Sequence, residues 1–245
     1  MSARNIHYTL RIASAMCFIG HGAFGIITKP IWCNYFAVFG ISHDLAYRLM
    51  PLLGTVDILM GISLLVYPTR AILAWLMGWG IITALLRPLS GEPFAELLER
   101  AGNFGAPLAL LILSGGGGKA RVAICLRIVV FLLLLGHGWL NLLEKKSLLS
   151  QYQGLGFSDP ARTALYAGLF EILAAVAILV RPVPALLVAL LIWKMGTELF
   201  YPHWELFEWV ERGGSYGCLL ALWLVIRQKG FAVKTSSDIK KPAFN

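Results

Sequence analysis

Charged side chains are scarce in this chain of 245 residues. Only 14% of the residues are Asp, Glu, Lys or Arg, whereas 58% are hydrophobic and the mean hydropathy is +0.72. An ordinary soluble domain is about 25% charged and roughly 45–50% apolar. So few polar groups cannot cover the outside of a soluble domain, and that class is excluded. We therefore expect much of the protein surface to contact lipid. The lipid bilayer is thus the first partner that the sequence predicts.

Other features that the sequence lacks narrow its function. The four cysteines form no Cys-x-x-Cys pair and do not indicate a disulfide framework. There is no P-loop, dinucleotide-binding glycine motif, His-Glu-x-x-His or nucleophile elbow, so the sequence predicts no metal site and no self-contained catalytic centre. The net charge of +8 comes from helix ends and the C-terminal tail, without an aromatic-basic surface. We expect no nucleic-acid partner.

What the sequence does have is an internal repeat. Leu10-Arg11-Ile12 and Gly20-His21-Gly22 recur 116 residues later, at 126–128 and 136–138. Asp57-Ile58-Leu59 recurs 114 residues later as Glu171-Ile172-Leu173. Further matches follow in the same order: Gly40 with Gly156, Pro68 with Pro182, Trp79 with Trp193, Thr83 with Thr197, Pro88 with Pro202, Glu99-Arg100 with Glu211-Arg212, and Gly105 with Gly217. These ordered matches indicate a duplication that gave a first copy and a second copy.

Each copy contains four apolar runs of about 20 residues, the length that crosses a bilayer. The expected spans are 9–27, 46–66, 70–87 and 94–114 in the first copy, and 121–143, 162–180, 183–200 and 206–226 in the second. The predicted fold is an all-α integral membrane protein with about eight transmembrane helices in two four-helix modules. We expect these modules at 1–114 and 121–227, a glycine-rich linker at 115–120, and a polar basic tail at 228–245. No span is convincingly interrupted.

Four spans per copy give both copies the same orientation in the membrane, so the repeats are parallel rather than inverted. Lys and Arg residues are more frequent near the helix ends on the side of the two termini, mainly because of the tail. The positive-inside rule then places both termini in the cytoplasm. We expect a multi-pass protein of a bacterial-type inner membrane.

Four ionisable residues fall at membrane depth, where such residues are costly and usually face a bundle interior. His21 and His137 lie about three turns into the first helix of each copy, near the bilayer middle at ~1.5 Å per residue. Asp57 and Glu171 occupy matching positions in the second helix. We expect a His–carboxyl pair in each copy. Such pairs either contact a ligand or proton, or only fix helix packing.

The third helix distinguishes the two copies. Lys194 and Glu198 in the second copy replace Gly80 and Ala84 of the first, and their spacing puts them on one helix face. Lys194 lies near the depth of Glu171, so a Glu171–Lys194–Glu198 network is expected in the second copy alone. If one copy carries a specialised site, this pattern favours the second. The alternative is an internal salt bridge with a purely structural role.

The fourth span of each copy must include a charged pair, Glu99-Arg100 or Glu211-Arg212, in its outer turns. We expect these pairs at the outer lip of the bundle, either at the mouth of a pocket or as interfacial charges that snorkel to water. Trp79 and Trp193 are too deep for an aromatic belt, so we expect them to line the interior of each module.

Each copy resembles the DoxX/DoxD-like family of small four-helix membrane proteins. The residues that carry the resemblance are Gly20-His21-Gly22, Gly40-Ile41, and Glu99-Arg100-x-Gly-x-x-Gly105, with their counterparts at 136–138, 156–157 and 211–217. The tandem arrangement departs from the usual single module. The resemblance implies a membrane subunit that is linked to quinone or that accompanies redox enzymes.

Three functions remain open at this point. The first is a redox-accessory subunit that holds a quinone near His137, Glu171 and Lys194, with partner proteins supplying the electrons. The second is a transporter of a small solute or lipid, because parallel repeats with midplane charges also describe transporters. The third is a scaffold. Two midplane histidines could in principle ligate a haem, but nothing in their spacing indicates one, and the only candidate cofactor is quinone.

Overall fold

The computed structural model describes residues 3–200 and 205–237, and these residues form helices joined by turns and loops, with no β-strand among them. The first copy contains α1 (Ala3–Ile26), α2 (Trp32–Ala37), α3 (His43–Val66), α4 (Arg70–Leu89), α5 (Ala95–Glu99) and α6 (Ala101–Ser114). The second contains α7 (Lys119–Leu142), α8 (Lys146–Gly154), α9 (Pro160–Val180), α10 (Pro184–Glu198), α11 (Glu205–Glu211) and α12 (Gly213–Ser237).

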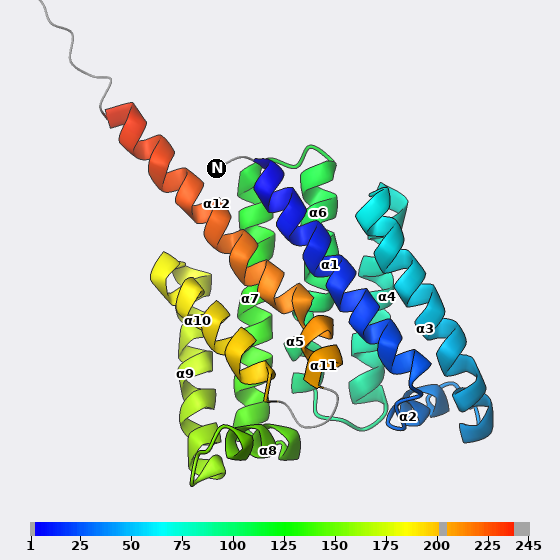
Figure 1. Cartoon of the computed structure of the whole chain (residues 1–245). Coiled ribbons are helices and arrows are strands. Elements are labelled where there is room, and N and C mark those ends of the chain that lie inside the picture. The colour runs from blue at the N-terminus through cyan, green and yellow to red at the C-terminus, as the bar shows by residue number, and fades with distance from the viewer. Residues whose placement is uncertain (1–2, 201–204, 238–245) are drawn as a thin grey trace, which may run out of the picture.

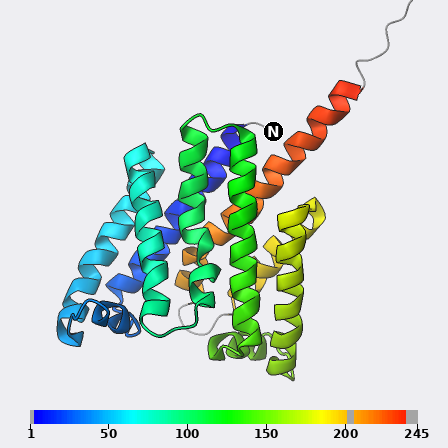
Figure 2. The same ribbon diagram turned by 180° about the vertical axis from the view of Figure 1, so that it is seen from behind.

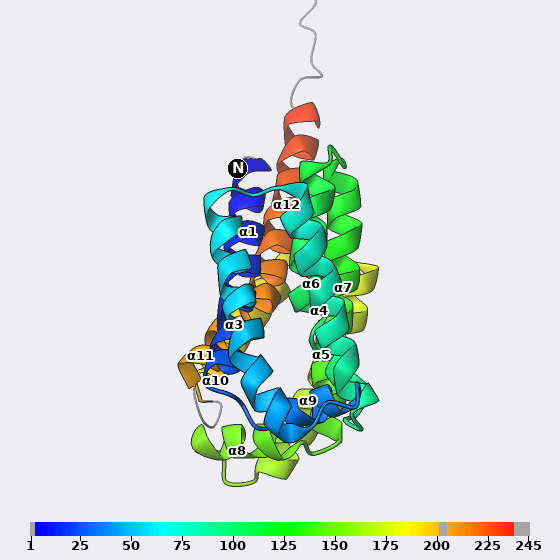
Figure 3. The same cartoon turned by 90° about the vertical axis from the view of Figure 1, so that its right-hand side faces the viewer.

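The axes of the long helices are roughly aligned, and the helices form a bundle. Figure 1 shows α1 and α12 crossing the middle of the bundle, with α3 and α4 on one side and α9 and α10 on the other. Seen from behind, α6 and α7 stand side by side at the centre (Figure 2). The short helices α2 and α8 lie at the end opposite the N-terminus (Figure 3). The main core is built from apolar side chains of α1, α6, α7 and α12, with one side of the outer helices packed on it.

Helix starts and stops follow local sequence signals. Thr69 caps α4, where its hydroxyl accepts a hydrogen bond from the Ile72 N–H at 3.2 Å. Asp159 caps α9 in the same way, accepting from the Arg162 N–H at 3.0 Å. Pro160, which follows it, has no N–H to leave unsatisfied at the first helical position. These caps fix where the outer helices enter the bundle.

Residues that the repeat aligns adopt the same local geometry. Thr28 and Glu144, which end α1 and α7, are the two non-glycine residues with positive φ among the described residues, at 54° and 51°. Arg11 donates to the Leu64 and Leu65 carbonyls at the end of α3. The aligned Arg127 donates to the carbonyls of Leu179 and Val180, which end α9. In each copy, therefore, an arginine of the first helix satisfies the exposed end of the second.

Within the part of the chain that the structure describes, five helices are long and apolar enough to cross a membrane by length and composition: α1, α3, α4, α7 and α9. The other three expected spans differ from the prediction. The run at 183–200 gives α10, which has 15 residues. The runs at 94–114 and 206–226 are not continuous helices, because α5 stops before Arg100 and α11 stops before Arg212. The expectation of uninterrupted spans was wrong at these two aligned positions.

The two copies interlock rather than sit side by side. In addition to its contact with α3, helix α1 packs on α11 and α12 of the second copy. In the same way, α7 packs on α9 and also on α5 and α6 of the first copy. The fourth segment of each copy thus lies against the first helix of the other copy, which the sequence did not indicate.

Candidate functional site

A histidine and a carboxylate form a pair in each copy, as expected. His21 Nδ1 lies 2.8 Å from Asp57 Oδ2, and His137 Nδ1 lies 2.6 Å from Glu171 Oε2. Both carboxylates are almost fully buried, with exposures of 1% for Asp57 and 0% for Glu171. In both pairs the carboxylate occupies Nδ1, so Nε2 is the ring nitrogen that remains for other partners.

Close helix crossings bring these pairs together. A Cβ atom added to Gly22 in α1 would lie 2.5 Å from the Gly54 carbonyl oxygen of α3. A Cβ atom added to Gly138 in α7 would lie 2.8 Å from the Gly168 carbonyl oxygen of α9. Only glycine allows such close approach. The glycines that flank each histidine therefore place its ring within hydrogen-bond reach of the next helix.

The pair in the second copy has extra partners that the sequence reading missed. Asn141 donates to Glu171 Oε2 at 3.1 Å, and the Tyr152 hydroxyl donates to Asn141 Oδ1 at 2.9 Å. Asn141 follows His137 by one helical turn, which was the available signal. His137 Nε2 is buried and has no hydrogen bond among the described residues. All four side chains of this arrangement are buried.

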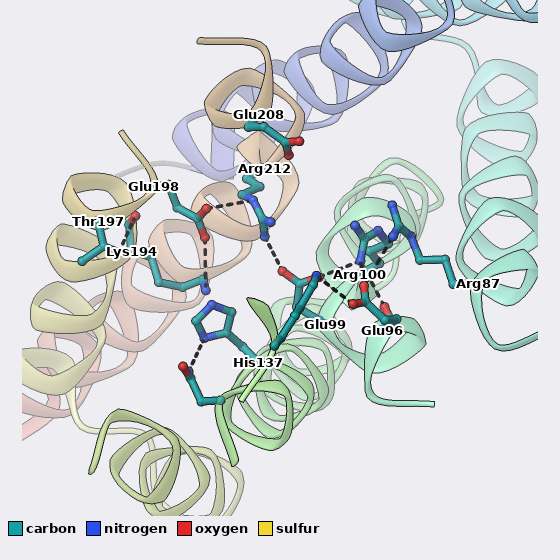
Figure 4. Close-up of polar contacts among 12 residues, drawn as sticks. Arg87, Glu96, Glu99, Arg100, His137, Lys194, Thr197, Glu198, Glu208 and Arg212 are labelled. Carbon is teal, nitrogen blue, oxygen red and sulfur yellow. Dashed lines mark hydrogen bonds and ion pairs between the residues drawn. The ribbon is translucent and has the colours of Figure 1, made fainter. Parts of the chain in front are cut away.

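A chain of ion pairs runs from α10 through the middle of the bundle into the first copy (Figure 4). Lys194 Nζ lies 3.7 Å from Glu198 Oε1, and Glu198 Oε2 lies 2.8 Å from Arg212 Nε. Arg212 also donates to Glu99 across the boundary between the copies. The predicted Lys194–Glu198 pair is therefore present, but no ion pair joins Lys194 to Glu171 among the described residues.

On the first-copy side the chain continues with alternating charges. Arg100 NH1 lies 2.7 Å from both Glu96 Oε2 and Glu99 Oε2. Glu96 also pairs with Lys145 at 2.7 Å and with Arg87 at 3.4 Å. Most of these side chains are buried, so each charge depends on its neighbours for compensation.

The two Glu-Arg pairs do not lie at an outer lip, and that part of the prediction was wrong, although Arg100 and Glu211 do line a cavity. Glu99, Glu211 and Arg212 are only 3%, 6% and 8% exposed. A Cβ atom added to Gly136, the neighbour of His137, would lie 2.7 Å from the backbone of Leu98. The charged pairs are thus at the level of the histidines. The sequence reading assumed a continuous fourth helix, whereas the break puts these residues inside the bundle.

A largely apolar cavity of about 120 Å³ lies beside His21 and is lined by residues of the first copy together with Glu211 of the second. An apolar cavity of roughly 150 Å³ can hold a benzene ring, so this space suits a single aromatic ring. His21 stacks on Trp32 with ring centroids 4.6 Å apart. The lining consists mainly of aromatic and aliphatic side chains with a few polar groups: His21, Trp32, Tyr35, Phe36, Phe39, Ile41, Leu53, Trp79, Thr83, Leu86, Arg87, Arg100, Asn103 and Glu211.

The cavity is in the copy that the sequence reading did not favour. Lys194 and Glu198 are each 1% exposed, so their side chains fill interior space in the second copy. Gly80 and Ala84, the aligned residues of α4, are buried as well and do not line the cavity. The added charges of the second copy therefore fill its interior and do not form this cavity.

The aligned tryptophans also differ in role. Trp79 lines the cavity, as expected. Trp193 is 37% exposed, so the prediction that it lines the interior was wrong. The same residue type at matching positions thus contacts the cavity in one copy and the outside in the other.

Polar groups of the cavity are held by the ion-pair chain and by α2. Arg87 and Arg100 both contribute to the lining. Arg87 NH1 forms ion pairs with Glu92 Oε2 at 3.0 Å and with Glu96 Oε2 at 3.4 Å. The Tyr35 hydroxyl donates to Glu92. Burial raises the pKa of Tyr35 well above its ordinary value, so this hydroxyl stays protonated at any physiological pH.

No protein-family model, curated protein or solved structure matches this chain. Within the described residues, no group of three or more His, Cys, Asp or Glu side chains is placed to hold a metal ion. The features of the chain that bear on its function are the cavity, the His–carboxyl pairs and the apolar helices.

Proposed function

We propose that the protein is a redox-accessory subunit of a bacterial-type inner membrane that holds a quinone in the cavity of the first copy. The observation that carries this proposal is the cavity itself, with aromatic walls and a carboxylate-paired histidine. The apolar helices support a membrane location, and quinones are dissolved in the membrane. Electrons would come from partner proteins, because the sequence contains no cofactor-binding motif.

In this proposal the chain crosses the membrane eight times, as two parallel four-helix modules with both termini in the cytoplasm. The five long apolar helices would span the bilayer directly. The broken segments α5–α6 and α11–α12 would reach into it from the bundle interior, where irregular backbone is tolerated because protein surrounds it. The matched geometry at Arg11 and Arg127 supports a common module.

The chemistry of the cavity suits a quinone ring. Trp32 and Trp79 provide aromatic surface for stacking, which adds to the gain from burying an apolar ring. Nε2 of His21 is the nitrogen that can contact the quinone, because Nδ1 is hydrogen-bonded to Asp57. A histidine held by a carboxylate can exchange a proton with a ligand oxygen while the carboxylate stabilises its charged form. The His21–Asp57 pair would therefore be the proton-exchanging group.

A comparison of aligned tryptophans tests the proposal. The protein would be purified in lipid nanodiscs, its visible spectrum recorded, and its bound quinone extracted and quantified. Trp79→Leu removes a cavity wall, whereas Trp193→Leu makes the same change at the exposed aligned position. We expect bound quinone to be lost in the first variant and kept in the second. Equal retention in both variants, or no quinone in the unmodified protein, would contradict the proposal.

A transporter is the second candidate, and the broken helices favour it. The breaks before Arg100 and Arg212 leave helix ends inside the bundle, as discontinuous helices do in many transporters. Uptake of a solute into vesicles that contain the protein, without bound quinone, would select this function. A protein that neither binds quinone nor transports would be left with the scaffold role, in which the buried charges only specify helix packing.

A further inference from the structure

Glu211 differs from the other buried carboxylates of the bundle. It is 6% exposed and lines the apolar cavity. Among the described residues, its carboxylate takes part in no hydrogen bond and no ion pair. Buried carboxylates are normally held by a hydrogen-bond donor or an ion pair, because burial of an unpaired charge is unfavourable.

Glu99, the carboxylate that the repeat aligns with Glu211, does have partners. Glu99 is held by Arg212 from the other copy and by Arg100 next to it. By the repeat, Arg100 should hold Glu211 as Arg212 holds Glu99. Instead, Arg100 is turned to Glu96 and Glu99. The carboxylate that lines the cavity therefore has no hydrogen-bonding side chain among the described residues, although the nearby charges of His21 and Arg100 act on it.

Backbone contacts fix Glu211 beside the histidine. A Cβ atom added to Gly20 would lie 2.7 Å from Glu211 Cα, so the end of α11 rests directly on α1 one residue before His21. Both residues line the cavity. A ligand there meets a carboxylate that can only accept a hydrogen bond and a histidine whose Nε2 accepts when the ring is neutral with its proton on Nδ1.

We infer that the cavity selects an aromatic ring with a free hydroxyl group, such as a phenol or hydroquinone, and that Glu211 accepts the hydrogen bond from that hydroxyl. This inference rests on the proposed function and adds the chemical form of the ligand. The aromatic lining accepts the ring, and Glu211 supplies the acceptor. A cationic ligand would also pair with Glu211, but Arg87 and Arg100 face the same cavity and would repel it.

The size of the selection follows from the hydrogen bond. A hydrogen bond to a charged acceptor favours binding of the donor by roughly 10- to 100-fold. An ether of the same shape fills the cavity but leaves Glu211 unpaired, so it loses this factor. Glu211→Gln keeps an acceptor oxygen but removes the charge, and it should reduce the preference to a few-fold. Glu211→Leu should abolish it.

The test uses the full chain in nanodiscs and three probes of similar size: 4-hexylphenol, its methyl ether 4-hexylanisole, and 4-hexylbenzylammonium. Binding would be measured by calorimetry, with empty nanodiscs subtracted to remove partition into lipid. We expect the phenol to bind about 10- to 100-fold more tightly than the ether, with a few-fold preference left in Glu211→Gln and none in Glu211→Leu. Glu144→Gln, a change at an exposed carboxylate, should keep it.

The outcomes separate the inference from the proposed function. If phenol and ether bind equally, and both depend on Trp79, the quinone-ring site stands and the role of Glu211 is overturned. A preference for the ammonium probe would also overturn it, in favour of a cation site. If none of the three probes binds, both proposals fail. The comparison of probes on the unmodified protein decides the matter even if a Glu211 variant does not fold.

Discussion

Arg212 holds the two copies together through buried charges, and its replacement by methionine gives a measurable loss of stability. Arg212 pairs with Glu198 of its own copy and donates to Glu99 of the other. Removing one partner of a buried ion pair costs about 3–5 kcal/mol, because the remaining charge is left uncompensated. Glu99 keeps Arg100 at 2.7 Å and Glu198 keeps Lys194 at 3.7 Å, so we expect the low end, about 3 kcal/mol.

The assay is reversible unfolding in mixed micelles, with helix content followed by circular dichroism as the fraction of SDS rises. Arg121→Met, at an exposed position of α7, is the matched control and should change stability by less than about 0.5 kcal/mol. Arg212→Lys keeps the charge without the planar fork and should fall between the two. If Arg212→Met costs no more than Arg121→Met, the ion-pair chain does not hold the copies together and the reasoning is refuted.

Three further predictions concern packing and pH. In the same unfolding assay Gly102→Ala should cost about 1–3 kcal/mol, because its Cβ would lie 2.7 Å from Ser215 N, whereas Gly78→Ala, with open space around it, should be neutral or stabilising. Asp159→Ala removes the cap of α9 and should cost about 1 kcal/mol; no loss would show that the cap is dispensable. Because the folded protein keeps the Tyr35 proton that the unfolded chain releases near pH 10, stability should fall as the pH rises above about 10, and Tyr35→Phe should reduce that fall.

Much of the helical architecture could be predicted from the sequence, because hydrophobic runs and repeat matches are local signals. The pairing of His21 with Asp57 and of His137 with Glu171 was also predictable, since two midplane groups at matching depth satisfy each other at little cost. The cap at Asp159, directly before a proline, follows from its residue type.

The breaks before Arg100 and Arg212 could not be predicted from hydropathy. Their cause is tertiary: each break lets a Glu-Arg pair turn toward charges of the other copy. A sequence shows which residues share a helix face but not which helix of the other copy that face meets. For this reason the charged pairs were expected at the surface, although the structure buries them.

The position of the cavity was the most instructive difference. The sequence favours the copy with the added residues Lys194 and Glu198 as the one that carries a specialised site, if only one does. Where a cavity forms depends on how the side chains pack, and this one is lined neither by Lys194 and Glu198 nor by their aligned residues Gly80 and Ala84. The sequence could not show either that Glu211 has no hydrogen-bonding partner, because this depends on Arg100 pairing with Glu96 and Glu99 instead.

The most direct test of the account is photolabelling of the protein in nanodiscs with a photoreactive quinone, followed by mass-spectrometric mapping of the labelled peptides. The account predicts labelling of α2 and α4, which carry Trp32 and Trp79, and competition by 4-hexylphenol. Labelling of α9 and α10 around Lys194, or labelling that excess competitor does not reduce, would contradict a ligand site in the first copy.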